Sequence, residues 1–173
     1  MSAVSQAAPR SVVADDALRF EHLVQINDAR DMRVDAMSRE QLWRGLMLRA
    51  QAPKLFIPWL DEADIRYNDD GSLQRTLRFG DFEVHDRVTF EHEAHVHYEV
   101  EDHRANTRFR LTMRIEEPAP AALFVRFTYE AQSTDHHAQS PLSAFVRGAY
   151  RQADEDTVFR IRQFAASGAL EEQ

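Results

Sequence analysis

The sequence predicts an α+β fold in which a strongly curved, antiparallel seven-stranded sheet wraps around a long C-terminal helix. The elements occur in the order strand, two short helices, six strands and long helix. Six consecutive strands with short connections indicate an antiparallel meander. The strands and the long helix each carry one apolar face, and the simplest way to bury both faces is against each other.

The N-terminal part begins with a strand and continues with a helix. Residues 18–26 alternate apolar and polar side chains, and Asn27-Asp28 ends this strand. Ser38 precedes Gln41 by three residues, which is a capping-box pattern that predicts the start of a helix. The apolar stripe of this helix runs to Ala50.

A second, very short helix at residues 54–57 lies between two prolines, and the pattern then changes to strands. Asn68-Asp69-Asp70-Gly71 is typical of a turn, and Gly80-Asp81 predicts a two-residue hairpin turn. The alternating segments predict six strands, at residues 65–67, 73–79, 84–90, 96–100, 109–115 and 123–129.

The C-terminal part predicts an amphipathic helix of up to seven turns. Pro141 suits the first turn, and apolar residues recur at spacings of three and four until Gly168, which suits a left-handed cap. Ala149 and Ala153 lie on the predicted stripe. Because they are small, we expect them to leave space for a cavity between helix and sheet.

Length and composition fit one domain. The chain has 173 residues, of which 43% are hydrophobic and 29% charged, and these are ordinary values for a globular protein. We expect a flexible N-terminus at residues 1–16 and a single domain at residues 17–170. The absence of cysteine excludes disulfides, thiolate nucleophiles and Cys-ligated metal sites.

Several classes of partner are disfavoured. The net charge of −8 argues against a nucleic acid held by phosphate contacts. No apolar run approaches the ~18 residues of a membrane span, and the N-terminus lacks a signal-peptide pattern. No glycine-rich phosphate loop occurs. We therefore expect a cytoplasmic protein without membrane insertion.

Five segments resemble the AtaL-like branch of the SRPBCC (START-like) superfamily. They agree with it in order and spacing over roughly residues 18–170, and they lie at residues 20–28, 39–46, 77–81, 86–88 and 149–157. The resemblance implies the helix-grip fold. It does not imply one function, because the superfamily places lipid carriers, hormone receptors, polyketide cyclases and chaperone activators on the same scaffold.

Three polar residues interrupt the apolar face of the predicted sheet, namely His22, Arg75 and Asp86. Buried polar groups are costly unless they are paired, so they are informative. The Gly80-Asp81 turn places Arg75 opposite Asp86. The pair is either a structural bridge that also receives a hydrogen bond from Tyr98, or a polar anchor for a ligand.

The same reasoning predicts a row of residues across the sheet. Pairing apolar with apolar residues places Asp86 beside Tyr98, Tyr98 beside Leu111, and Leu111 beside Phe127. The expected row therefore reads Arg75, Asp86, Tyr98, Leu111 and Phe127.

His22 is the candidate catalytic base, since its pKa allows proton transfer near neutral pH. A single histidine on an apolar face is otherwise a core residue with satisfied hydrogen bonds. The residues that we expect at the ligand are His22, Arg75, Asp86, Tyr98, Leu111, Phe127, Ala149 and Ala153.

Histidines elsewhere suggest a metal site only weakly. His85, His95 and His97 share the outer face of the sheet, where a solvated surface is the simpler explanation, and Asp135-His136-His137 lies in a loop without a third ligand nearby. We expect no metal.

The leading hypothesis is a binding module, a carrier or sensor, that holds a hydrophobic or aromatic small molecule between sheet and C-terminal helix without a cofactor. The alternative is a cofactor-independent cyclase or dehydratase acting on a polyketide-like or lipid-like substrate, in which His22, Asp86 and Tyr98 handle protons and Arg75 stabilises an oxyanion. A third possibility is a protein-interaction module of the chaperone-activator type. Self-association into a homo-oligomer stays open.

Overall fold

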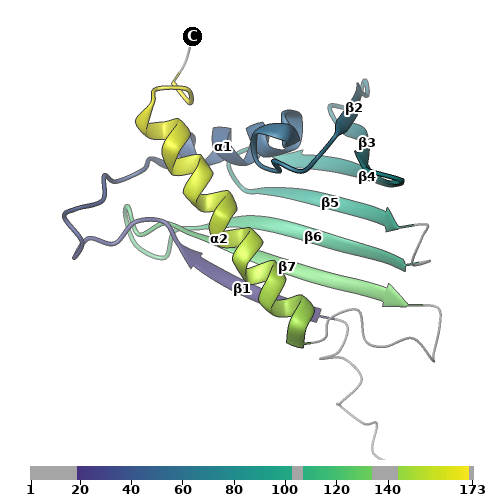
Figure 1. The fold of residues 1–173 in the computed structure, drawn as a ribbon. Coiled ribbons are helices and arrows are strands. Elements are labelled where there is room, and N and C mark those ends of the chain that lie inside the picture. The colour runs from purple at the N-terminus through teal and green to yellow at the C-terminus, as the bar shows by residue number, and fades with distance from the viewer. Residues whose placement is uncertain (1–18, 103–106, 134–143, 172–173) are drawn as a thin grey trace, which may run out of the picture.

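The computed structural model describes residues 19–102, 107–133 and 144–171 (Figure 1). The N-terminal segment 1–16, the Asp135-His136-His137 loop and Pro141 lie outside these residues. The elements in chain order are β1(Arg19–Gln25), α1(Arg39–Gln51), the 3-10 turn η2(Pro53–Leu55), β2(Glu62–Tyr67), β3(Leu73–Phe79), β4(Phe82–Glu91), β5(His95–Asp102), β6(Thr107–Glu116), β7(Phe124–Ser133) and α2(Ala144–Ala166).

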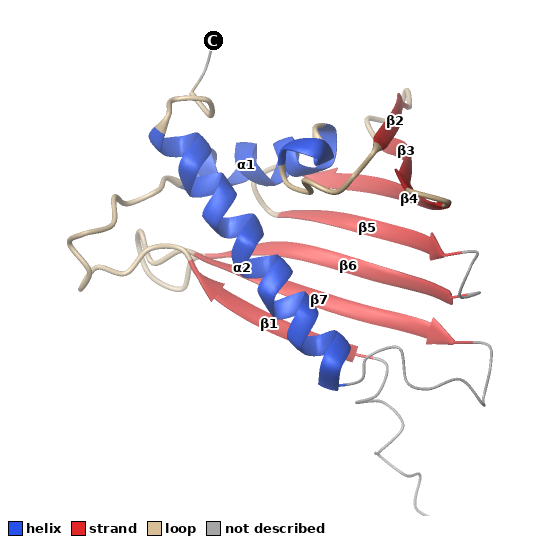
Figure 2. Ribbon diagram, in the orientation of Figure 1, coloured by secondary structure: helices blue, strands red, loops and turns tan. Residues whose placement is uncertain are grey.

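The predicted fold class is confirmed. The seven strands form one antiparallel sheet in the order β1-β7-β6-β5-β4-β3-β2, so only β1 leaves the meander, to pair with β7. Helix α2 crosses one face of the sheet diagonally, and α1 lies near its β2–β4 end (Figure 2). We call the sheet face turned towards α2 the inner face, and the opposite face the outer face.

Helix α1 begins as predicted and approaches α2 very closely. Ser38 accepts a hydrogen bond from the Gln41 backbone, and the Gln41 side chain accepts one from the Ser38 backbone, which completes the capping box. At Gly45 a β-carbon would lie 2.4 Å from the Cγ2 atom of Ile161 on α2. Only glycine therefore permits this helix crossing. None of the helices in the described ranges is long and apolar enough to cross a membrane.

The hairpin register at Gly80-Asp81 is confirmed, and the next register is corrected. Arg75 pairs with Asp86 as predicted, but Asp86 pairs with Val100 and not with Tyr98. The turn decides this, because Ala94 N donates to the Glu91 carbonyl. A shift of two residues keeps every side chain on its predicted face, so alternation alone does not distinguish the two registers.

The last hairpin needs the same kind of correction. Tyr98 pairs with Leu111 as predicted, but Leu111 pairs with Tyr129, and Phe127 pairs with Met113. The register is again displaced by two residues, and apolar residues face each other in both versions. The five residues of the expected row therefore lie in three separate rows on one face: Arg75 with Asp86, Tyr98 with Leu111, and Phe127 with His22.

Helix α2 is rotated relative to the predicted stripe. Ala149 and Ala153 are exposed, which corrects the expectation that they face the sheet. Asp154 and Thr157 are buried instead, at 2% and 6% exposure. The side of α2 that packs on the sheet is therefore partly polar. Its polar residues form part of a site that the spacing of apolar residues did not predict.

Candidate functional site

Three ionisable side chains from three elements meet between the sheet and α2. His22 lies on β1, Tyr129 on β7 and Asp154 on α2. The Tyr129 hydroxyl donates a short hydrogen bond to Asp154 Oδ1, and His22 Nδ1 lies 3.4 Å from Asp154 Oδ2. We call these three residues the acid cluster.

Burial changes the acidity of Asp154 strongly. Its carboxyl is removed from water, which raises its pKa to about 7, although the hydrogen bond from Tyr129 and the charge of Arg49 oppose this shift. Near neutral pH the carboxyl is therefore present in both protonation states. This is the range in which an acid can both give and accept a proton.

Tyr129 acts as a hydrogen-bond donor within the cluster. Burial, followed by the neighbouring charge of Asp154, raises the pKa of its hydroxyl, so the proton stays on the oxygen. The ring is stacked on Tyr150 of α2, with centroids 4.1 Å apart and an interplanar angle of 8°. This stack holds the hydroxyl in place beside the carboxyl.

His22 is the most accessible member, with 18% of its side chain exposed. Burial lowers the pKa of His22, and the charge of Arg151 lowers it further, while Glu155 acts in the opposite direction. The carboxyl beside the ring is that of Asp154. The lowered pKa makes the imidazole a neutral base at neutral pH, and it lies beside the Asp154 carboxyl.

Arg75 and Asp86 form a separate, buried pair. Arg75 Nε and Nη2 donate to the two Asp86 carboxylate oxygens at 2.8 and 2.6 Å, and Arg75 Nη1 donates to the Ala50 carbonyl at 3.0 Å. Burial acts to lower the pKa of Arg75, but the hydrogen bond and charge of Asp86 outweigh it and raise the pKa. The pair therefore stays charged and joins the end of α1 to the sheet, which is the structural role predicted as one alternative.

Tyr98 lies between two arginines and does not donate to the Arg75–Asp86 pair. Its ring centroid is 5.1 Å from the Cζ atom of Arg75 and 5.3 Å from that of Arg49. Its hydroxyl is buried and finds no hydrogen-bond partner in the described part of the chain. Arg49 Nε in turn donates to the Thr157 hydroxyl on α2 at 3.4 Å, so these side chains lead from the Arg75–Asp86 pair towards the acid cluster.

The structure brings some of the predicted site residues together and not others. His22 pairs across the sheet with Phe127, and Tyr98 pairs with Leu111; Phe127 and Leu111 are both buried. The Arg75–Asp86 pair lies beside Tyr98. Ala149 and Ala153 are exposed and contribute nothing to the acid cluster.

Sequence reasoning missed Asp154, Tyr129 and Arg49. One signal was available for Asp154, because it lies four residues after Tyr150 and four before Val158, on the apolar side of the helix. The adjacent Glu155 and Asp156 made it look like part of a solvated acidic run. Tyr129 was placed on the correct face but assigned only an apolar role.

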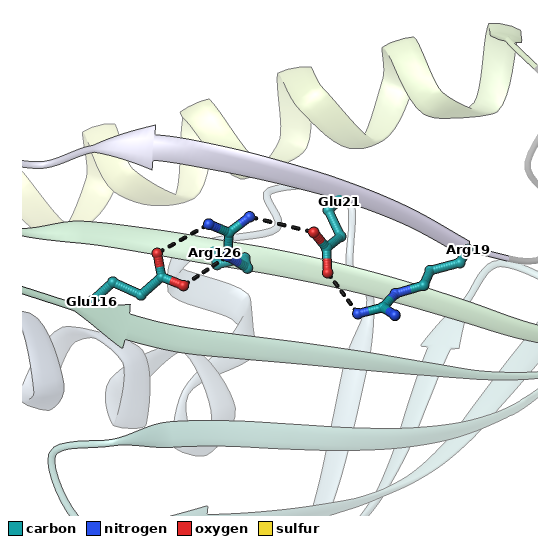
Figure 3. Close-up of polar contacts among 4 residues, drawn as sticks. All are labelled: Arg19, Glu21, Glu116 and Arg126. Carbon is teal, nitrogen blue, oxygen red and sulfur yellow. Dashed lines mark hydrogen bonds and ion pairs between the residues drawn. The ribbon is translucent and has the colours of Figure 1, made fainter. Parts of the chain in front are cut away.

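The outer face of the sheet carries exposed ion pairs, and the acid cluster lies on the opposite side. Figure 3 shows Arg126 of β7 bound to Glu116 of β6 by two hydrogen bonds of 2.7 and 3.1 Å, and to Glu21 of β1, which also accepts from Arg19. Exposed pairs of this kind contribute little stability individually. In residues 19–102, 107–133 and 144–171, no three His, Asp or Glu side chains gather closely enough to hold a metal ion.

A hollow of about 690 Å³ is lined by residues of β2 to β6. Its lining comprises Ile65, Arg75, Asp86, Val100 and Phe109 together with two cross-strand rows of mainly polar and charged side chains, Asp64–Thr76–His85–Glu101–Arg108 and Arg66–Gln74–Arg87–Glu99–Arg110. The side chains of these two rows alternate with the buried Arg75 and Asp86 along their strands, so they belong to the outer face. None of the residues that line the hollow belongs to the acid cluster.

Comparison with known proteins identifies the family. A model of the AtaL family, described as "Acetylaranotin biosynthesis cluster protein L", matches residues 21–168. No curated protein matches. The family match agrees in extent with the segments that carry the resemblance in the sequence.

Solved structures share the fold at low sequence identity. Ara h 8.0201 aligns with a TM-score of 0.61 and 11% identity over 86% of this chain and 97% of its own. Norcoclaurine synthase from Thalictrum flavum aligns with a TM-score of 0.59 and 11% identity over 96% and 98% of the two chains.

The di-domain ARO/CYC StfQ from the steffimycin biosynthetic pathway aligns with a TM-score of 0.65 and 11% identity, over 91% of this chain and 54% of its own. These identities establish a common fold and not a common activity. The family match and these neighbours together show that the chain belongs to the AtaL family, with an SRPBCC-like helix-grip fold.

Proposed function

We propose that this protein binds a mainly apolar small molecule between the inner face of the sheet and α2, beside the acid cluster. The observation that carries the proposal is the buried Asp154 carboxyl, which the Tyr129 hydroxyl and the His22 ring face from the sheet. A buried acid of this kind costs stability, and such perturbed groups are concentrated at functional sites.

Apolar side chains on the inner face support the proposal. Ile65, Val84 and Phe109 point to the inner side of β2, β4 and β6 and are only partly buried, as is Tyr150 on α2. Phe109 and Tyr150 are also neighbours, with ring centroids 6.4 Å apart. Aromatic and aliphatic walls with a few polar groups are typical of small-molecule sites.

The fold neighbours allow both a carrier and an enzyme. Two of them carry the names of enzymes, the ARO/CYC StfQ and norcoclaurine synthase, whereas the name of Ara h 8.0201 states no activity. We favour a carrier or sensor because binding needs only complementarity to the ligand. In that role His22, Tyr98, Leu111 and Phe127 are the predicted residues that would contact or support the bound molecule.

One observation favours the enzyme as a second candidate. A carboxyl with a pKa of about 7 lies beside a neutral imidazole, and such a pair can move a proton in either direction at neutral pH. A cofactor-independent cyclisation or dehydration requires such transfers. His22 would be the base because it is more exposed than Asp154.

The test begins with the molecule that accompanies the protein. Native mass spectrometry of the purified protein should reveal a co-purified small molecule, and Nile red should gain fluorescence on binding. His22→Gln keeps hydrogen-bonding capacity and removes the base, so we expect it to bind nearly as well as the parent. His92→Gln is the matched control, because 83% of the His92 side chain is exposed.

The outcomes separate the two candidates. Turnover of the co-purified molecule by the parent that disappears in His22→Gln, with binding intact and the His92 variant unaffected, would establish the enzyme. Absence of any co-purified molecule, together with Nile red fluorescence no higher than that of a denatured control, would contradict the binding proposal itself.

A further inference from the structure

Arg49 and Tyr98 carry polar groups that have no partner among the residues that the structure describes. We infer that the bound molecule has an anionic oxygen group, such as a carboxylate, and that Arg49 and the Tyr98 hydroxyl recognise it. The inference rests on the proposed binding function and adds the ligand's chemical class and its specificity-determining residues.

Arg49 is a partly buried cation without a counter-ion. It lies near the end of α1, where Nε donates a long 3.4 Å hydrogen bond to Thr157 and the guanidinium lies over the Tyr98 ring. Within the described ranges no carboxylate lies within ion-pairing distance of it, and its two terminal nitrogens have no acceptor. A partly buried guanidinium in this state is unusual, because burying an unpaired charge is costly.

The Tyr98 hydroxyl is a second unpartnered donor in the same place. Tyr98 is 2% exposed, and its hydroxyl makes no hydrogen bond to any residue that the structure describes. Nearly all buried polar groups in proteins have a partner, so an orphan of this kind needs an explanation. The hydroxyl belongs to the ring that Arg49 covers, so the two unpartnered groups lie on adjacent side chains.

The surrounding charges leave the site positive. Arg75 lies on the same ring, but its charge is neutralised by Asp86 and each of its three nitrogens already donates a hydrogen bond. The Asp154 carboxyl interacts electrostatically with Arg49, yet the two form no ion pair, and the raised pKa of Asp154 leaves it partly neutral. One uncompensated positive charge and one free hydroxyl donor therefore remain, and together they suit an anion.

The planar shape of the Arg49 guanidinium further defines the chemical class of the ligand. Its parallel N–H groups match the two oxygens of a carboxylate, and charge-assisted hydrogen bonds of this type are stronger than neutral ones. The partly buried Ile65, Val84 and Phe109 would then accommodate the apolar body of the molecule. The ligand class is thus an apolar acid.

Two probes of the same shape test this directly. 2-Naphthoate carries the carboxylate and 2-naphthamide is its neutral counterpart, and isothermal titration calorimetry at pH 7.5 gives the affinity of each. We expect the parent to prefer the carboxylate by at least about tenfold, since 1.4 kcal/mol corresponds to a factor of ten. Arg49→Gln should abolish this preference and leave the affinity for the amide within about twofold to threefold.

Two further variants test whether the effect is specific to Arg49 and Tyr98. Tyr98→Phe removes a hydroxyl that makes no hydrogen bond to any described residue, so the fold should be kept while the preference for the carboxylate falls. Arg66→Gln is the control, because it removes the same charge from an exposed position on β2. It should behave like the parent.

Each possible result decides the matter. If the parent binds both probes equally, or if Arg49→Gln weakens both probes to the same extent, the inference is wrong while the proposed binding function stands. If the parent binds neither probe at millimolar concentration and also fails to bind Nile red, the proposed function fails and the inference fails with it.

Discussion

Replacing Asp86 by alanine should cost more stability than any single change on the outer face. The substitution removes two of the three hydrogen bonds of Arg75, at 2.8 and 2.6 Å, and keeps only the bond to the Ala50 carbonyl. The Arg75 side chain is only 4% exposed, so water cannot replace the lost carboxylate without local opening. A buried positive charge is then left without its partner.

The expected loss is large for a point mutation. Breaking one side of a buried ion pair typically lowers the free energy of unfolding by about 3–5 kcal/mol. For a chain of this length, one kcal/mol corresponds to a shift in Tm of roughly 2–4 °C. The melting temperature of Asp86→Ala should therefore fall by roughly 6–20 °C.

Urea denaturation of parent and variants measures the effect. Glu83→Ala on the same strand is the control, because its side chain is 50% exposed and its loss should change the free energy of unfolding by less than about 0.5 kcal/mol. Replacing Arg75 and Asp86 together by leucine should recover much of the stability, since no charge stays buried. Equal losses in Asp86→Ala and Glu83→Ala would refute the reasoning.

Three more predictions concern the contacts that α2 makes with the sheet and with α1. The pKa of Asp154 is higher in the folded state (about 7) than its ordinary value of 3.8, so its stabilising contribution is complete below about pH 4 and is lost as pH rises to 7. Denaturation at several pH values should show a flatter dependence for Asp154→Asn than for the parent; an unchanged slope would contradict the assignment. Tyr129→Phe removes a hydrogen bond that lowers the pKa of Asp154, so carboxyl ¹³C NMR should find that pKa raised further, and a fall would argue against the contact. Gly45→Ala forces a β-carbon against Ile161 and should lower the free energy of unfolding by about 1–3 kcal/mol, measured by urea denaturation. Gly148→Ala is the control, because no atom lies near its new β-carbon, and it should be neutral or stabilising. Similar effects at both glycines would mean that α1 and α2 do not approach closely.

Local signals in the sequence were sufficient for the elements and for one hairpin. Alternation located the strands, the Ser38–Gln41 capping box located the start of α1, and Gly80-Asp81 set the pairing of Arg75 with Asp86. These features depend on residues close together in the chain. Side-chain parity was predictable for the same reason, because it follows from a period of two.

Register beyond that hairpin was not predictable from alternation. Shifting a strand by two residues keeps each side chain on its face and still pairs apolar with apolar, so Asp86 could be assigned to Tyr98 or to Val100. The turn at Glu91–Ala94 selected the second pairing. In this turn Glu93 adopts a left-handed conformation, with φ of 52°. Because the residue is not a glycine, the sequence did not indicate this conformation.

The candidate site depended most on tertiary structure. By itself the sequence determined that α2 is amphipathic and that His22 faces inward. Its three acidic residues at 154–156 look equally solvated, and small differences in helix rotation decide which of them is buried. That rotation is set by contacts between distant segments, namely Gly45 against Ile161 and Tyr129 against Asp154. Only the packed molecule therefore brings an acid to the inner face and leaves Arg49 beside it without a counter-ion.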